Sequence, residues 1–308
     1  MEMAAEPVGG AVPPPAPPSP PAPPAPPAPP RVRGPRLDRR GLLASTLLAV
    51  LALTAAFAGA LGLRDPVAQP DPVRLSSQPP SAAYPLGTDP FSRDVLSRVI
   101  YGGRVSLGVA ALAVAVAMLI GTAYGAVAGQ AGRRTDAVMM RAVDAFLSIP
   151  RILLVMALLA LWGGVSLPAL VALLGLTSWF GVSRLVRAEV LALRERDFVI
   201  AARALGVSRL AILARHLLPN IVTPLLVSVT LVARNVILLE AGLSFLGIGV
   251  QQPTPSWGSI IRDGAEQVGQ HWWISFFPGL TIALTVMALD ALGDGLREAL
   301  DPRQLPRP

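Results

Sequence analysis

The sequence predicts an all-α polytopic membrane protein with six transmembrane helices behind a disordered, proline-rich N-terminal tail. Of its 308 residues, 53% are hydrophobic and 15% are charged, and the mean hydropathy is +0.56. A soluble domain usually carries about 25% charged residues. Six apolar segments each approach the roughly 20 residues that cross a bilayer. Arginines flank these segments instead of gathering on one soluble face, as in membrane proteins.

The first 36 residues form the tail. They hold 15 of the 32 prolines, many in Pro-Pro-Ala repeats. Proline cannot donate a backbone hydrogen bond, so we expect a semi-extended polyproline segment with no packed core. A ligand for a proline-recognising partner is the alternative reading of this tail.

Six candidate spans follow the tail. The first is too long for the apolar region of a signal peptide, about 7 to 15 residues, so we expect it to be retained. In the third, Pro150 precedes Arg151 and predicts a kink. Before the second, the stretch 93–101 places Val95 and Val99 on one face and predicts an amphipathic helix at the membrane interface. The candidate spans are residues 41–63, 105–128, 138–162, 167–186, 221–248 and 276–293.

The arginine distribution predicts the orientation. With the N-terminus inside, 18 arginines fall on the cytoplasmic side and six outside. The positive-inside rule then predicts a multi-pass protein of the bacterial inner membrane with both termini in the cytoplasm. Trp272 and Trp273, before the last span, fit either an interfacial aromatic belt or ordinary packing. The six outer arginines are Arg64, Arg74, Arg93, Arg98, Arg104 and Arg262.

The composition excludes several classes of chemistry. There is no cysteine, so disulfides, thiol nucleophiles and cysteine metal sites are absent. All 26 basic residues are arginine, and without lysine the chain has no P-loop and no Schiff base. His216 and His271 lie too far apart for a zinc helix. We therefore expect no catalytic site, no metal site, no cofactor and no nucleic-acid partner.

The longest cytoplasmic connection, residues 187–220, is too polar to span a membrane and too periodic for a random loop. We predict two short helices, 198–205 and 208–217, that meet at Gly206. Ser208 would cap the second helix, and Pro219 would end it. The alternative is an interfacial helix that contacts only lipid.

This connection resembles the EAA loop of permease subunits of binding-protein-dependent ABC importers. The matching residues, at the family's spacing, are Ala201, Ala202, Gly206, His216, Leu218 and Pro219. Further segments, in order, are similar to the second permease of the dipeptide, oligopeptide and nickel group. They are Pro85-Leu-Gly-Thr-Asp-Pro-Phe91 with Arg93-Asp94, Ser148-Ile-Pro150, Leu238-Leu-Glu-Ala-Gly-Leu-Ser-Phe-Leu-Gly247, Pro253-Thr-Pro-Ser-Trp-Gly258 and Leu292-Gly-Asp-Gly-Leu-Arg297 with Asp301-Pro302.

The resemblance implies an importer permease (MetI-like) core at residues 85–303, preceded by a first helix and external loop at 37–84 and followed by a short tail at 304–308. It also implies a second homologous permease, two ATP-binding cassette subunits, an extracytoplasmic solute-binding protein and a lipid bilayer around the chain. Peptides are the expected solute; nickel or another small solute is the alternative.

Within the loop, the resemblance assigns ATPase coupling to Ala201, Ala202, Gly206, His216 and Pro219. The family motif opens with a glutamate, and this chain has Ile200 there. We therefore expect docking of the ATPase to depend more on apolar contact at Ile200. Glu195 or Asp197 could supply the missing charge.

Charged residues at membrane depth each need a partner or a function, because insertion costs at least about 2.5–3.5 kcal/mol. Arg234 and Glu240 lie in the fifth span and are candidates for the translocation path. Pairing of Arg234 with a carboxylate of this chain or of the partner permease is the alternative. A proton-coupled transporter would use Glu240, Asp290 and Asp294 as a relay. A membrane-embedded enzyme lacks an apparent catalytic cluster.

Overall fold

The structure is a computed structural model that describes residues 38–161 and 166–300. Over these residues the chain is helical, with no strand beyond an isolated bridge between Thr88 and Asp94. The predictions for the tail at 1–36 and for the C-terminal tail at 304–308 lie outside the described residues, as does the last residue of the third candidate span.

Within the described part of the chain, five helices are long and apolar enough to cross a membrane. Each extends beyond its predicted span at one or both ends, but the first stops at Ala56 and the fourth at Phe245, short of the predicted ends at 63 and 248. The shorter elements connect these helices at the two ends of the molecule. The long helices are α1 (Arg39–Ala56), α2 (Val95–Gln130), α5 (Leu167–Arg194), α8 (Leu218–Phe245) and α10 (Trp273–Leu300), and the short elements are η1 (Ala58–Ala60), α6 (Asp197–Ala204), α7 (Arg209–Ile212), a π-helical turn (Leu213–Leu217) and α9 (Trp257–Ala265).

The third candidate span is not one continuous helix. It is broken into α3 (Arg133–Leu147) and α4 (Arg151–Leu161), whose axes meet at 84°. Pro150 lacks an N–H and disfavours a helical residue before it, so α3 must end first. The carbonyl of Pro150 then accepts from Leu154 N at 3.1 Å, which begins α4. The kink predicted at Pro150 is confirmed, but it is large enough to divide the span.

The stretch 93–101, predicted to be an amphipathic helix at the interface, does not form a separate helix. This stretch is the first part of α2, which runs unbroken for 36 residues. The carboxylate of Asp94 caps it by accepting from Ser97 N at 3.1 Å. Val95 and Arg98 are fully buried within the protein. The apolar face of this stretch therefore packs against α9 and α10.

The tightest helix pair is α2 with α5. Gly121, Gly125 and Gly129 recur every fourth residue on α2. A Cβ on Gly121 would lie 2.6 Å from the Cβ of Val182, and one on Gly129 would lie 2.6 Å from Val190 Cγ1. Small residues at this spacing let helix backbones approach closely in membranes. The glycine stripe thus fixes how α2 packs on α5.

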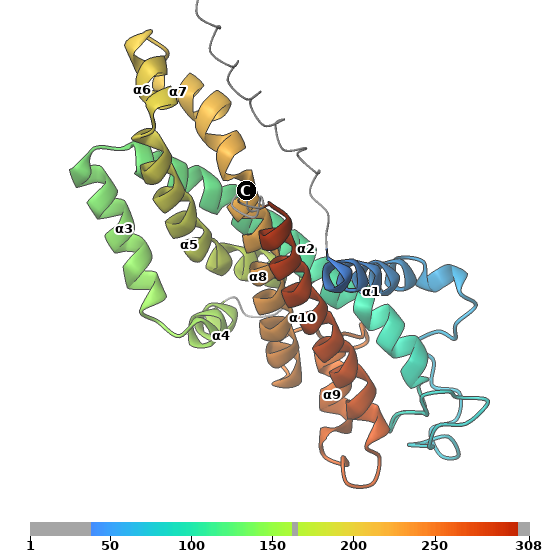
Figure 1. Cartoon of the computed structure of the whole chain (residues 1–308). Coiled ribbons are helices and arrows are strands. Elements are labelled where there is room, and N and C mark those ends of the chain that lie inside the picture. The colour runs from blue at the N-terminus through green and yellow to red at the C-terminus, as the bar shows by residue number, and fades with distance from the viewer. Residues whose placement is uncertain (1–37, 162–165, 301–308) are drawn as a thin grey trace, which may run out of the picture.

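Figure 1 shows that the shorter elements gather at opposite ends of the bundle. Helices α6 and α7 lie at one end, beside the end of α5, and α9 lies at the other, near the loops that precede α2. Helix α1 lies across α2 and α10 and contacts both.

Of the two tryptophans at the start of α10, Trp273 has a packing role. It is 5% exposed, and its indole N–H donates to the carbonyl of Thr88 at 3.2 Å. Trp272 is half exposed. Trp273 therefore holds the loop before α2 against α10.

Candidate functional site

The turn between α6 and α7 has the geometry that its sequence predicts. Gly206 has φ +80°, a conformation that a residue without a Cβ adopts freely. Its N–H donates to the carbonyl of Arg203 at 3.0 Å, and Val207 N donates to that of Ala202 at 3.1 Å, which closes α6. Ser208 Oγ accepts from Ala211 N at 3.3 Å and caps α7. Both the turn at Gly206 and the cap at Ser208 are confirmed.

The prediction that Pro219 ends the second helix is wrong. The chain stays helical from Arg209 to Phe245. A proline has no N–H for the carbonyl four residues before it, and here a π-helical turn, Leu213–Leu217, precedes it and changes the hydrogen-bond register. Pro219 itself lies in the first turn of α8, where its N–H is not needed. Helix α7 is therefore continuous with the candidate membrane helix α8.

One side of the α6–α7 segment is anchored to the bundle. Val199, Ala202, Ile212 and Leu217 are buried in a cluster with residues of α2, α5 and α8. A side chain that is part of the core moves with the helices that form it. A force applied to this segment therefore reaches α5 and α8 directly.

The same segment also carries exposed apolar side chains. Leu205 is 84% exposed, Leu210 is 74% exposed and Ile200 is 51% exposed, and Phe198 is also exposed. We call these four side chains the coupling surface, after the role that the sequence resemblance predicts for this segment. Exposed large apolar side chains of this kind suit contact with a partner.

The remaining motif residues lie around this surface. Ala201 and Pro219 are exposed, and Ala202 is buried beneath the turn. His216 is partly buried, with its ring 6.4 Å from that of Phe198. Within residues 38–161 and 166–300, no group of His, Asp and Glu could hold a metal ion. The position of His216 favours a packing role.

A cleft of about 520 Å³ lies beside the coupling surface, between the end of α2 and the α6–α7 turn. Its lining includes Arg194, Arg203 and Arg209 against one acid, Glu195. The excess of positive charge suits an acidic group of a partner.

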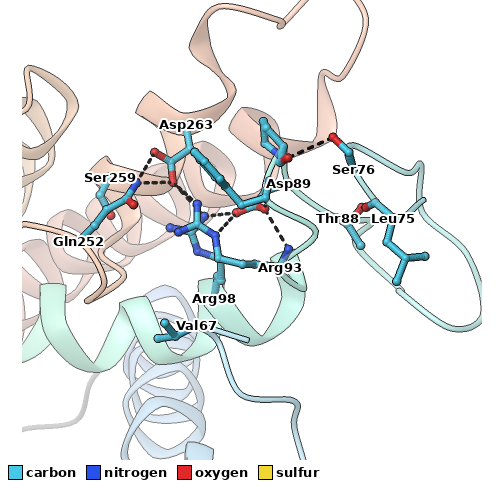
Figure 2. A network of polar contacts seen from close by, with 12 residues as sticks. Val67, Leu75, Ser76, Thr88, Asp89, Arg93, Arg98, Gln252, Ser259 and Asp263 are labelled. Carbon is cyan, nitrogen blue, oxygen red and sulfur yellow. Dashed lines mark hydrogen bonds and ion pairs between the residues drawn. The ribbon is translucent and has the colours of Figure 1, made fainter. Parts of the chain in front are cut away.

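A buried network of charges lies at the opposite end. Figure 2 shows Arg93 and Arg98 between the carboxylates of Asp89 and Asp263. Arg93 bonds Asp89 at 2.6 Å and Asp263 at 2.8 Å, and Arg98 bonds Asp263 at 2.9 Å and also pairs with Asp89. All four side chains are at most 5% exposed. Two positive and two negative charges balance, which removes the cost of a lone buried charge.

We call these four residues the outer network, after the side of the membrane that the arginine distribution predicts for them. The network joins two segments that are distant in sequence. Asp89 and Arg93 precede α2, whereas Asp263 lies on α9. Gly258 lets α9 approach α8, because a Cβ there would overlap the backbone of Ala241. Sequence reasoning missed Asp89, Arg98 and Asp263 as a group. No local pattern signals this group, because Asp263 lies 165 residues after Arg98.

The two candidates for the translocation path occupy different environments. Arg234 Nη1 donates to Asp290 Oδ1 of α10 at 2.8 Å, and both side chains are about one third exposed. Glu240 is fully buried and accepts from Ser106 Oγ at 2.9 Å and Ser244 Oγ at 2.7 Å. The burial of Glu240 between α2 and α8 favours a structural role, whereas Arg234 can meet a ligand.

The sequence matches known proteins over most of its length. The family described as binding-protein-dependent transport system inner membrane component matches residues 121–305. The chain is 41% identical over 226 residues to the dipeptide transport system permease protein DppC of Bacillus subtilis, which covers 73% of this chain and 70% of that protein.

Two further relatives have comparable coverage. A putative peptide transport system permease protein of Brucella suis is 43% identical over 233 residues, 75% of this chain and 77% of its own length. The oligopeptide transport system permease protein OppC of Haemophilus influenzae is 39% identical over 230 residues, 74% of each chain. This chain is therefore a multi-pass membrane protein that belongs to the family of binding-protein-dependent transport system inner membrane components.

Proposed function

We propose that this chain is the permease subunit of an ABC importer that carries peptides across the bacterial inner membrane. A second homologous permease would complete the path, and an extracytoplasmic binding protein would deliver the solute. Two ATP-binding cassette subunits would hydrolyse ATP, and both termini would lie in the cytoplasm. The relatives named for dipeptide and oligopeptide transport support peptides as the solute.

The coupling surface is the observation that carries this proposal. It presents Ile200, Leu205 and Leu210 to the outside of the molecule, while the same segment is anchored by Val199 and Ile212 within the bundle. Exposed apolar side chains gain free energy when a partner covers them, about 25 cal/mol per Å². A rigid apolar surface on a segment continuous with α8 suits the transfer of motion from an ATPase to the membrane helices.

The proposal is tested by reconstituting the complete transporter in liposomes, with the binding protein outside and ATP inside. We expect a dipeptide such as Ala-Phe, together with the binding protein, to stimulate ATP hydrolysis and to accumulate in the lumen. A nickel complex serves as the competing solute. Stimulation by nickel and not by peptide would contradict the assignment of peptides.

A second arm tests the energy source. A protonophore is expected to leave import unchanged, because no proton gradient is required. Import that continues without ATP but stops with the protonophore would indicate a proton-coupled transporter.

A further inference from the structure

An Arg–Asp ion pair joins two membrane helices and stays accessible. Arg234 of α8 and Asp290 of α10 share one hydrogen bond of 2.8 Å, with side chains 32% and 39% exposed. A guanidinium has five N–H donors and a carboxylate has about four acceptor positions. One bond uses a small part of this capacity. Contact with lipid is costly for such charges, so this pair faces a water-accessible path or another protein surface.

A pocket of about 440 Å³ continues the same face toward the C-terminal end of α10. Its lining includes Val227 and Leu231 of α8 and Arg297 of α10. Val227 lies seven residues before Arg234, and Asp290 lies seven residues before Arg297. Seven residues are about two helical turns, so each of these two pairs shares a helix face. The ion pair and the pocket therefore lie along one surface of α8 and α10.

We propose that the Arg234–Asp290 pair is a substrate subsite that recognises zwitterions by exchange of ion pairs. In the empty state the two protein charges neutralise each other. A solute with an ammonium and a carboxylate replaces this pair with two: its carboxylate binds Arg234, and its ammonium binds Asp290. This inference rests on the proposed import of peptides and adds the group that selects them.

Charge balance makes the subsite selective. A solute that carries one charge can engage one member of the pair and leaves the other without a partner. An unpaired charge at membrane depth is costly, whereas exchange with a zwitterion keeps every charge paired. The subsite therefore discriminates against peptides that are blocked at either terminus.

The test measures import of Ala-Phe, N-acetyl-Ala-Phe and Ala-Phe-amide by the reconstituted transporter. The import rate of each blocked form is divided by that of Ala-Phe. This ratio for each variant is then divided by the wild-type ratio, so that the preference of the binding protein cancels. Asp290→Asn is expected to raise the import ratio of the N-acetylated form and to leave that of the amide unchanged. Arg234→Gln is expected to raise the import ratio of the amide and to leave that of the N-acetylated form unchanged. Each change is expected to be about tenfold, the effect of one hydrogen bond to a charged group.

A matched control uses another interhelical pair. Arg187 of α5 bonds Asp136 of α3 at 2.6 Å and is also partly exposed. Asp136→Asn and Arg187→Gln are expected to leave all import ratios unchanged.

Three outcomes separate the hypotheses. Relaxation at one terminus in each single variant supports the subsite. If wild type imports Ala-Phe and the variants lose yield but keep wild-type import ratios, the subsite is overturned and the proposed function stays intact. Failure of wild type to import any of the three peptides overturns both.

Discussion

At the scale of single residues, small side chains determine how closely the two most tightly packed helices approach. Val182 lies where a Cβ on Gly121 would point, whereas nothing lies within 4 Å of a Cβ on Gly108 of the same helix. Overpacking a core typically costs about 1–3 kcal/mol. The two glycines therefore form a matched pair for mutation.

We expect Gly121→Ala to destabilise the protein by about 1–3 kcal/mol, because α2 must move away from α5. Gly108→Ala is expected to be neutral or slightly stabilising, since alanine favours a helix by about 1 kcal/mol over glycine. Thermal unfolding of the purified protein in detergent measures both. Equal melting temperatures for the two variants would contradict the account of this packing.

A second residue-scale prediction concerns Ile200, which replaces the glutamate of the family motif. Its side chain is half exposed, so Ile200→Glu buries no charge. We expect the variant to fold like wild type and to copurify with the ATPase as well as wild type or better.

Leu210→Glu, an acid placed on the same surface away from the motif, is the matched control and is expected to weaken copurification. Loss of the ATPase with Ile200→Glu would contradict the prediction, because it would show that docking requires an apolar side chain at this position.

Sequence reasoning succeeded at residues whose conformation is set locally. Gly206 and Ser208 form their turn and cap with neighbours fewer than five residues away. It failed at Arg98, whose partner Asp263 is 165 residues away. Hydropathy and periodicity describe an element alone, and they do not reveal a charge that another element neutralises.

At the scale of elements, the loop before α2 and the helix α9 form one unit through the outer network. Removal of one member of a buried ion pair is strongly destabilising, by about 3–5 kcal/mol, because the remaining charge has no partner. Asp263 contributes to the pairing of both Arg93 and Arg98.

We therefore expect Asp263→Ala to destabilise the protein by about 3 kcal/mol or more and to expose residues 64–94 to protease first. Glu266→Ala, three residues further and exposed, is the control and is expected to behave like wild type. Limited proteolysis with mass spectrometry measures both. Wild-type protection in Asp263→Ala would show that the network does not hold this loop.

Element boundaries show the same division between local and distant causes. Proline chemistry predicts that the helix bends at Pro150, but the 84° angle depends on how α4 packs against α5. At Pro219 the local rule predicts an end, and the π-helical turn before it accommodates the proline instead. Prediction of the start of α2 at Val95 requires the burial of its first turn by α9 and α10, which the local sequence does not reveal.

At the scale of the whole molecule, composition and the six apolar segments are sufficient to predict the class of fold. Their spacing is not sufficient to predict the packing, because lipid-facing and protein-facing apolar residues look alike in sequence. The two ends of the bundle then differ in kind. One end carries the exposed coupling surface, and the other carries the buried outer network.

The central claim is that the coupling surface faces the cytoplasm and meets an ATPase there. The chain contains no cysteine, so one introduced cysteine gives a unique label. Val73 is 88% exposed on the segment before α2, and Leu205 is 84% exposed on the coupling surface. In the direct measurement, spheroplasts that carry Val73→Cys or Leu205→Cys are treated with a membrane-impermeant maleimide before and after permeabilisation.

We predict that Val73→Cys reacts in intact spheroplasts. Leu205→Cys is predicted to react only after permeabilisation, and more slowly when the ATPase subunits are present. Labelling of Leu205→Cys in intact spheroplasts, or a rate that the ATPase does not change, would contradict the account.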